Sequence, residues 1–460
     1  MEKKVAGVCA VDQLPTEVLF LILSNLGNVE DLVAASLVCK EWCSVAHDQL
    51  MWKALYWRLS FLHGEEGAAT VSTRSAATLM VAEESQDWRK KFRERVAGDK
   101  TWMNGRHEPV FFNPTEAAAK KYNTTKVSSS FRGCAFSPVN ESLFSTACYN
   151  GMACLCNAAA RSPTEKLVKQ VQLIGRLHST RWNLDGTKVM FGSHNNSLSV
   201  VDVERWEPLH QYANQFFGGS DRGALAISQE DPNLVAGGGN PGAEHALFDI
   251  RVKDKPIRTW KAHTHTIRDM CFVDGSWFGL SSGELLLSCG NGANSSGQAI
   301  LCDLAGNVLA SRCIMEAGES SHWLAGAYSV TVTPPYFGSG NKAKYDSKRC
   351  VTVGLNGKVL LLPCNQFTNS NYEKFIFLSH LPLRPVWKLR YNSNGTLLFA
   401  ASDGGVVNMY HRKEDGSHIM VKKIIQHLND IEDCDISIHD NYLITALQDD
   451  TIGIVAPVFH

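Results

Sequence analysis

The chain has 460 residues, enough for two or three domains or for one large repeat architecture. Its 45 basic and 46 acidic residues give a net charge of −1, which argues against recruitment of nucleic acid or of an anionic membrane by bulk charge. No run of 18 apolar residues occurs, and the N-terminus lacks the apolar core of a secretory signal. We therefore expect a protein of the cytoplasm, the nucleus or both, with no nucleic-acid and no membrane partner.

The 14 cysteines are expected to be small buried hydrophobes in a reducing compartment. Only Cys154 and Cys156 lie close together, and no second pair follows at the spacing of a zinc finger. We expect no metal site and no cofactor.

The first sixty residues predict a small all-helical domain. Apolar residues share one helical face, with Pro15 in the first turn, at Leu14, Val18, Leu19, Ile22, Leu23 and Leu26. A second helix is expected from Val29, and a third over residues 41–59. These helices carry more large apolar side chains than so small a core can hide, which favours a partner-binding surface. The alternative is an ordinary helical bundle packed against the rest of the chain.

This stretch resembles an F-box in the order, the spacing and the N-terminal position of its residues. The matching residues are Leu14, Pro15, Ile22, Leu23, Leu26, Leu32, Val38, Cys39, Trp42 and Trp52. The resemblance implies a domain over residues 11–60 that binds a Skp-type adaptor protein and, through it, a cullin. It assigns adaptor binding to all of these residues except Cys39.

Residues 61–108 are expected to be a linker. The segment 63–86 is small and polar, which is typical of a loop. Trp88, Phe92 and Val96 then form one helical stripe among basic residues. A solvated helix face accounts for the basic residues better than a nuclear signal or a nucleic-acid patch. The segment that ends at residues 101–105 resembles the helical bridge that follows the F-box in related receptors.

From residue 109 on, short β-like runs alternate with turn dipeptides, at intervals of 45 to 47 residues except between 240 and 356, where 116 residues leave room for one longer turn and one loop-expanded unit. The dipeptides are Asn150-Gly151, Asn195-Asn196, Asn356-Gly357, Asp403-Gly404 and Asp449-Asp450. Similar turns are expected near Asn240 and Asn291, which makes seven units. Two-residue turns with positive φ at both positions are expected. A period near 45 with several strands per unit is typical of a propeller blade.

The repeat grammar resembles that of the WD-repeat family, which implies a mainly β, seven-bladed β-propeller over residues 109–460. The match is degenerate, because Val201-Asp202, Phe248-Asp249 and Cys302-Asp303 stand where the family has Trp-Asp. Ala262-His263 is the best remnant of the Gly-His signature, and His263 is expected to make a structural hydrogen bond within a blade. A strand from residues 110–128 is expected to complete the last blade and close the ring.

No catalytic motif is present, so a non-catalytic receptor subunit is expected, with no catalytic residues. Substrate binding is expected at the face where the first strands of the blades begin. Aligned first strands place a ring there, made of Arg132, His178, Gly223, Arg268, Tyr328, Trp387 and Glu432. Of these, the substrate-face candidates are Arg132, His178, Arg268, Tyr328 and Trp387. Arginines suit acidic or phosphorylated peptides, aromatic residues suit ordinary protein interfaces, and plain polar strand ends are the third alternative.

The layout as a whole resembles the plant members of the F-box/WD-repeat class. That resemblance implies the substrate-recognition subunit of a Skp-cullin-F-box ubiquitin ligase, whose propeller binds an unknown target protein. The alternatives are a scaffold that assembles protein partners without degradation and a propeller enzyme.

Overall fold

The structure is a computed structural model, and its description covers most of the chain after residue 101 and parts of the chain before it. The described residues are 19, 23, 34–38, 40–48, 52, 102–122, 129–194, 197–213, 224–239, 244–253, 255–291, 297–314, 326–334, 349–369, 376–378, 384–413 and 415–458. Two compact units are present, one containing residues 1–98 and one formed by most of residues 99–460. None of the described helices is long and apolar enough to cross a membrane.

The N-terminal unit contains the helix α3 (Lys40–His47). Val45 and Ala46 are buried, and the indole N–H of Trp52 donates a hydrogen bond to the Ala46 carbonyl at 2.9 Å. His47 closes the helix, its ring hydrogen-bonded to the Cys43 carbonyl one turn earlier. The other buried apolar side chains described in this unit are those of Leu19, Leu23, Ala35 and Trp52.

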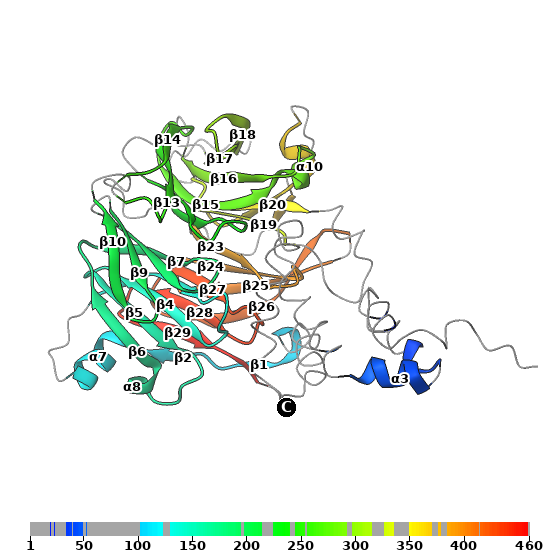
Figure 1. The fold of residues 1–460 in the computed structure, drawn as a ribbon, viewed down its shortest axis with the longest axis horizontal. Coiled ribbons are helices and arrows are strands. Elements are labelled where there is room, and N and C mark those ends of the chain that lie inside the picture. The colour runs from blue at the N-terminus through cyan, green and yellow to red at the C-terminus, as the bar shows by residue number, and fades with distance from the viewer. Residues whose placement is uncertain are drawn as a thin grey trace, which may run out of the picture. The chain divides into compact units, whose positions relative to one another are not determined.

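Within the described part of the chain, the second unit consists of seven four-stranded antiparallel sheets, which are the blades of a propeller (Figure 1). Blade 1 is β3 (Phe131–Phe136), β4 (Leu143–Cys148), β5 (Met152–Asn157) and β6 (Leu167–Gln172); blade 2 is β7 (Leu177–Trp182), β8 (Lys188–Ser193), β9 (Ser197–Asp202) and β10 (Glu207–Tyr212); blade 3 is β11 (Ala224–Ile227), β12 (Leu234–Gly238), β13 (Glu244–Asp249) and β14 (Arg258–Lys261); blade 4 is β15 (Ile267–Asp274), β16 (Glu284–Asn291), β17 (Gly297–Cys302) and β18 (Val308–Ile314). Blade 5 is β19 (Ser329–Val332), β20 (Cys350–Gly354), β21 (Val359–Pro363) and β22 (Ile376–Leu378); blade 6 is β23 (Val386–Tyr391), β24 (Leu397–Ser402), β25 (Val406–Arg412) and β26 (His418–Gln426); blade 7 is β27 (Ile431–Ile436), β28 (Leu443–Leu447), β29 (Ile452–Val455) and β2 (Val110–Phe112). The short helices α7 (Pro114–Tyr122), α8 (Pro163–Lys166) and α10 (Cys364–Phe367) and the 3-10 turn η2 (Gly275–Phe278) lie in the connections. The predicted seven-bladed propeller is confirmed.

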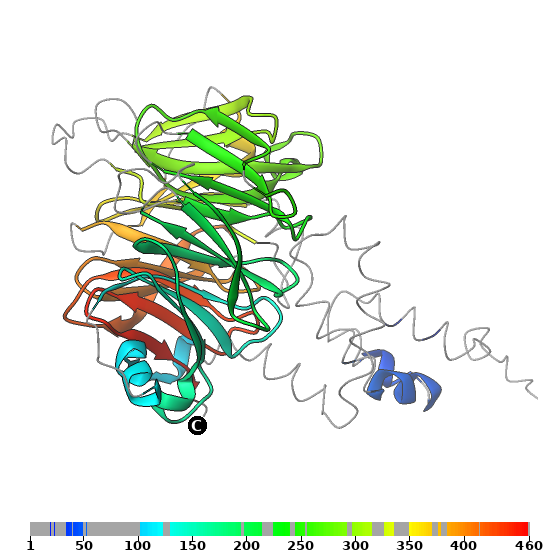
Figure 2. The ribbon, with the colours of Figure 1, turned by 60° about the vertical axis from the view of Figure 1, so that its left-hand side comes forward.

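The ring is closed by a strand that precedes the first blade in the sequence. Val110 pairs with Ile454 and Phe112 with Ile452, so β2 becomes the outer strand of blade 7. The first strand of blade 7, β27, packs against β3 of blade 1, and Figure 2 shows the red C-terminal strands beside the blue-green strands of that blade. The prediction of a closing strand from residues 110–128 is confirmed. Closure protects the strand edges that an open sheet would expose.

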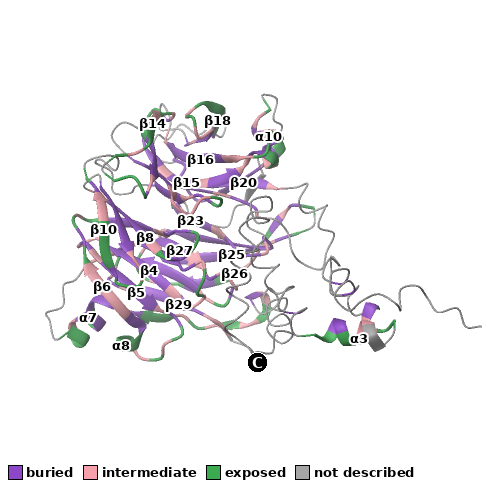
Figure 3. Ribbon diagram, in the orientation of Figure 1, coloured by how far each residue is buried: buried purple, intermediate pink, exposed green. Residues whose placement is uncertain are grey.

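Burial falls from the inner to the outer strands of the blades (Figure 3). The first three strands of blade 1 are almost wholly buried, whereas β6 has only one buried residue, Leu167. Apolar side chains of neighbouring blades interlock in shared clusters, such as the one that joins Phe131 and Phe144 of blade 1 with Ile444 and Ile452 of blade 7. These clusters hold adjacent blades together through apolar burial.

The hairpin turns differ from the prediction in their geometry. Asn150-Gly151 does mark the hairpin between β4 and β5, but positive φ occurs at Gly151 (90°) and not at Asn150. The amide of Gly151 donates to the Cys148 carbonyl at 3.0 Å, so the turn is a four-residue turn closed by a left-handed glycine. The expectation of a two-residue turn was wrong at this hairpin, because a turn followed by a left-handed glycine also matches the strand twist. Asn195, Asn196 and Asn240 lie outside the described residues.

Trp102 anchors the segment that leads into the propeller. Its indole is fully buried and donates to the Asp440 carbonyl at 2.6 Å. The ring centre lies 5.0 Å from that of the stacked His107 ring and 5.3 Å from that of Phe399, which it meets edge to face. Next to it, β1 (Arg106–His107) pairs with β30 (Pro457–Val458) at the other end of the unit. The ammonium of Lys422 donates to the Gly105 carbonyl at 2.9 Å. The segment is therefore fixed to blades 6 and 7; residues 88–101, where a bridging helix is expected, lie outside the described residues.

Replacing Trp102 should destabilise the propeller through loss of packing. We expect Trp102→Ala to lower the free energy of unfolding by about 3–5 kcal/mol. Trp102→Phe keeps an apolar ring and should cost less than the alanine variant. Urea unfolding followed by far-UV circular dichroism measures both, and a Trp102→Ala variant as stable as the unmodified chain would contradict the anchor.

Candidate functional site

The first strands of the blades carry three layers of corresponding residues along the central channel. The mouth layer is the predicted ring, whose described members are Arg132, His178, Arg268, Tyr328, Trp387 and Glu432. The middle layer, one residue further along, is Gly133, Ser179, Ala224, Asp269, Ser329, Lys388 and Asp433. The lower layer, two residues beyond the middle one, is Ala135, Arg181, Ala226, Cys271, Thr331, Arg390 and Asp435.

A β-bulge sets the mouth layer apart. In blade 1, Phe131 pairs with Cys148 and Gly133 with Ala147, so the ladder skips Arg132. The same skip leaves out His178, Arg268, Trp387 and Glu432. Bulges redirect side chains and often lie near functional sites. The correspondence between the first strands in the sequence therefore identified a position with its own backbone geometry, although the bulge itself carries no sequence signal.

One side of the mouth is a cluster of cationic and aromatic groups on blades 1, 2 and 7. The guanidinium of Arg132 pairs with Glu432 at 2.7 Å and lies 5.3 Å from the centre of the Tyr149 ring. Arg176 lies 4.9 Å from the same ring and donates to the Tyr149 hydroxyl at 3.1 Å. Tyr149 and Arg176 were missed by sequence reasoning, because they belong to connections and not to first strands.

A second cluster joins three predicted residues from blades 4, 5 and 6. The rings of Tyr328 and Trp387 meet edge to face at 4.8 Å, and Arg268 lies 6.0 Å from the Tyr328 ring. The indole N–H of Trp387 donates to Asp403. His178, in contrast, is buried, and a Cβ at Gly192 would come within 3.0 Å of its ring. Gly223 lies outside the described residues.

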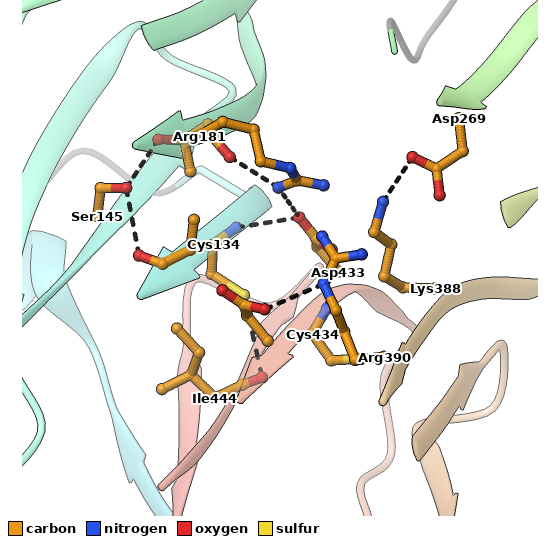
Figure 4. A network of polar contacts seen from close by, with 12 residues as sticks. Cys134, Ser145, Arg181, Asp269, Lys388, Arg390, Asp433, Cys434 and Ile444 are labelled. Carbon is orange, nitrogen blue, oxygen red and sulfur yellow. Dashed lines mark hydrogen bonds and ion pairs between the residues drawn. The ribbon is translucent and has the colours of Figure 1, made fainter. Parts of the chain in front are cut away.

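The middle and lower layers hold three ion pairs among the described residues, which Figure 4 shows across the channel. Asp269 pairs with Lys388 at 2.7 Å, Asp435 with Arg390 at 3.0 Å and Asp433 with Arg181 at 3.5 Å. Two of these pairs reach past a whole blade, from blade 4 to blade 6 and from blade 7 to blade 2.

Each aspartate also accepts a hydrogen bond from a further blade. Asp269 accepts from the amide of Val330 at 3.2 Å, Asp433 from that of Cys134 at 3.3 Å, and Asp435 from that of Phe136 at 2.8 Å. We call the three ion pairs and these hydrogen bonds the polar staples. One set of staples connects blades 4, 5 and 6, and the other set connects blades 6, 7, 1 and 2. Blade 3 supplies only the methyl groups of Ala224 and Ala226 to the same two layers.

The charges of the central pair depend on each other. Burial raises the pKa of Asp269, but Lys388, Arg390 and Arg181 together lower that pKa below its ordinary value. Burial lowers the pKa of Lys388, and the Asp269 carboxylate opposes that change. Asp269 therefore remains ionised at neutral pH while its positive neighbours are in place.

The thiols near the channel are not activated. Burial raises the pKa of Cys271 to about 12, and the carboxylate of Asp269 adds to the increase. Burial also raises the pKa of Cys134 and of Cys434, in both cases next to Asp433. No cluster of three potential metal ligands occurs among the described residues.

The predicted hydrogen bond of His263 is present, in a network that spans blades 3 and 4. The rings of His263 and His245 both lie 2.9 Å from the Ser288 hydroxyl, and His245 stacks on Trp260. His245 comes from β13 and Ser288 from β16, so the link extends between blades, whereas the sequence predicted one within a blade. Burial lowers the pKa of His245 to about 3, with a contribution from His263, and the pKa of His263 to about 4. Both rings are neutral at pH 7.

The residues expected to bind an adaptor occupy different environments in the N-terminal unit. Leu23 and Trp52 are buried, Trp42 is half-buried, and Val38 is 61% exposed. Leu37, next to Val38, is 82% exposed and was not among the predicted residues. The others, Leu14, Pro15, Ile22, Leu26 and Leu32, lie outside the described residues, as does Cys39 of the F-box match.

Comparison with known proteins identifies the N-terminal unit. Residues 11–58 match the F-box-like family model. No curated protein matches the chain. The chain therefore combines an F-box-like domain with a seven-bladed β-propeller. F-box proteins are typically non-catalytic adaptors, their F-box domains typically bind Skp-type adaptor proteins, and this combination fits an F-box substrate receptor.

Breaking the central ion pair should cost more than removing both charges. We expect Lys388→Met to lower the free energy of unfolding by about 3–5 kcal/mol, because it leaves a buried carboxylate unpaired. The double variant Asp269→Asn/Lys388→Met should be more stable than Lys388→Met alone. Chemical denaturation measures both, and Arg251→Met, which breaks an exposed ion pair with Asp249, serves as the control with no measurable change. A double variant less stable than the single one would contradict the coupling.

The buried histidine pair should make the propeller sensitive to mild acid. Because the pKa values of His245 and His263 are lower in the folded state, their stabilisation is complete above about pH 6.5 and is lost as pH falls toward about 4 and 3. Each histidine should lower the free energy of unfolding by about 1.4 kcal/mol for each pH unit below about pH 6.5. Urea unfolding at pH 7.5, 6.5 and 5.5 measures the slope. His263→Gln should reduce the slope and the exposed His265→Gln should not; equal slopes in all three proteins would refute the assignment.

Proposed function

We propose that this protein is the substrate-recognition subunit of a Skp-cullin-F-box ubiquitin ligase. The observation that carries the proposal is the F-box-like match over residues 11–58 in a chain that continues into a closed propeller. In this proposal the F-box domain docks on a Skp-type adaptor and through it on a cullin, and the propeller, of WD-repeat type, binds the target protein. Exposed Leu37 and Val38 are candidates for the adaptor contact. The complex would act in the cytoplasm, the nucleus or both.

The contribution to catalysis would be proximity. F-box proteins are typically non-catalytic adaptors, so the chemistry would come from other subunits. A receptor that holds target and conjugating enzyme in one complex raises their effective concentration.

The target would bind at the mouth layer. Arg268, Tyr328 and Trp387 form a continuous arginine-aromatic cluster, and Tyr149 holds Arg132 and Arg176 on another part of the mouth. Arginine, tyrosine and tryptophan are enriched among the few residues that dominate the binding energy of protein interfaces. Glu432 compensates Arg132, which supports recognition by shape and aromatic contact on that side more than by positive charge.

Adaptor capture tests the receptor proposal. The unmodified chain should co-purify with a Skp-type adaptor and a cullin, and Leu14→Ala/Pro15→Ala should weaken adaptor binding at least about tenfold. Trp387→Ala should leave adaptor binding unchanged and reduce capture of targets, which proximity labelling with and without proteasome inhibition would identify. Failure of the unmodified chain to bind the adaptor would contradict the proposal. Adaptor binding without target accumulation under proteasome inhibition would favour a non-degradative scaffold.

A further inference from the structure

The lower layer of the first strands surrounds a cavity. Its volume is about 260 Å³. Six of the seven lower-layer residues line it, namely Ala135, Arg181, Ala226, Cys271, Arg390 and Asp435. The cavity therefore belongs to the channel but lies two layers away from the mouth.

The cavity has a cause in the sequence of blade 3. In the lower layer, blade 3 has Ala226 at the position where blades 2 and 6 have Arg181 and Arg390. In the middle layer, blade 3 has Ala224. The short methyl groups leave space that longer side chains would fill. Among the described residues, blade 3 contributes neither a charged group nor an amide to the polar staples, whereas blades 1 and 5, which also lack charged residues in these two layers, contribute amides.

The cavity wall has an apolar side and a charged side. Blades 3 and 4 contribute Leu225, Ile227, Met270 and Phe272. Across from them, the charged groups of the wall are the guanidinium groups of Arg181 and Arg390 and the carboxylate of Asp435, while the Asp433 carboxylate that pairs with Arg181 is not part of the wall. Small-molecule sites combine an apolar lining with a few polar groups in this way.

Arg181 is the less compensated of the two arginines. Arg390 has the Asp435 carboxylate at 3.0 Å, whereas the carboxylate paired with Arg181, on Asp433, is 3.5 Å away. One N–H of Arg181 is taken by the Thr180 carbonyl at 2.7 Å. A guanidinium carries five N–H donors and binds a carboxylate through two parallel hydrogen bonds.

We propose that this cavity binds a small organic anion, a carboxylate attached to an apolar ring or chain. The carboxylate would pair with Arg181, and the apolar part would pack on the side chains of blades 3 and 4. A bound anion would connect blade 2 to blades 3 and 4, where the polar staples are interrupted. Because it binds only the folded ring, it would stabilise the propeller. The inference is independent of the ubiquitin-ligase proposal and goes beyond it.

The test uses the purified full chain and 3-phenylpropionate as the probe. Ligand-observed NMR and thermal unfolding should show saturable binding with a rise in Tm. The uncharged 3-phenylpropionamide and the short anion propionate should each bind at least about tenfold more weakly, because one lacks the charge and the other the apolar body. No saturable binding of 3-phenylpropionate, or equal binding of all three compounds, would overturn the proposal.

Two variants locate the binding site. Arg181→Met should weaken 3-phenylpropionate at least about tenfold. Ala226→Leu should abolish binding by filling the cavity. Because this variant leaves the polar staples in place, it tests the site even if Arg181→Met fails to fold. The exposed Arg205→Met in the same blade 2 is the matched control and should bind as the unmodified chain does. Binding that survives Ala226→Leu in a folded protein would place the anion elsewhere and refute the assignment.

Discussion

The pairing of β2 with β29 is the constraint on which the propeller depends. It gives the last blade its fourth strand from a segment that precedes the first blade, so the ring is held by backbone hydrogen bonds between the two ends of the unit. Closure also brings the first strands into close contact around one axis. Between blades 1 and 2 this contact requires a glycine, because a Cβ at Gly133 would lie 3.0 Å from the Cα of Ser179. The layers of the channel are a consequence of that closed arrangement.

The closed ring turns scattered charges into a buried network. Asp269 and Lys388 are 119 residues apart in the chain, yet their charged groups meet at 2.7 Å inside the channel. Burial disfavours each charge alone, so each aspartate is matched by a cation and by an amide of a further blade. The network crosses six blades and omits blade 3, whose residues in these two layers are Ala224 and Ala226. The cavity and the interruption of the staples therefore occur at the same blade.

The two proposed kinds of recognition would use different layers of the channel. A bulge sets apart five of the mouth-layer residues, Arg268 and Trp387 among them, and the cluster of Arg268, Tyr328 and Trp387 is where we propose that a target protein binds. The middle layer, occupied by Asp269 and Lys388, lies between that surface and the cavity. Recognition of a target protein at the mouth and of a small anion in the cavity would therefore use different residues of the same strands, and either could change without the other.

The sequence by itself determined the F-box-like segment, the blade period, the closing strand and the positions of the mouth layer. Those features follow from local patterns: helical spacing, turn dipeptides and alternating apolar runs. Only the tertiary structure decided the bulges, the turn at Gly151, the partnership of His245 with His263, and the pairing of Arg176 with Tyr149. Each of these depends on groups that are distant in sequence or on a choice between turns of similar energy. The cavity was also decided by the tertiary structure, because the two alanines of blade 3 leave empty space only once the seven first strands surround one axis.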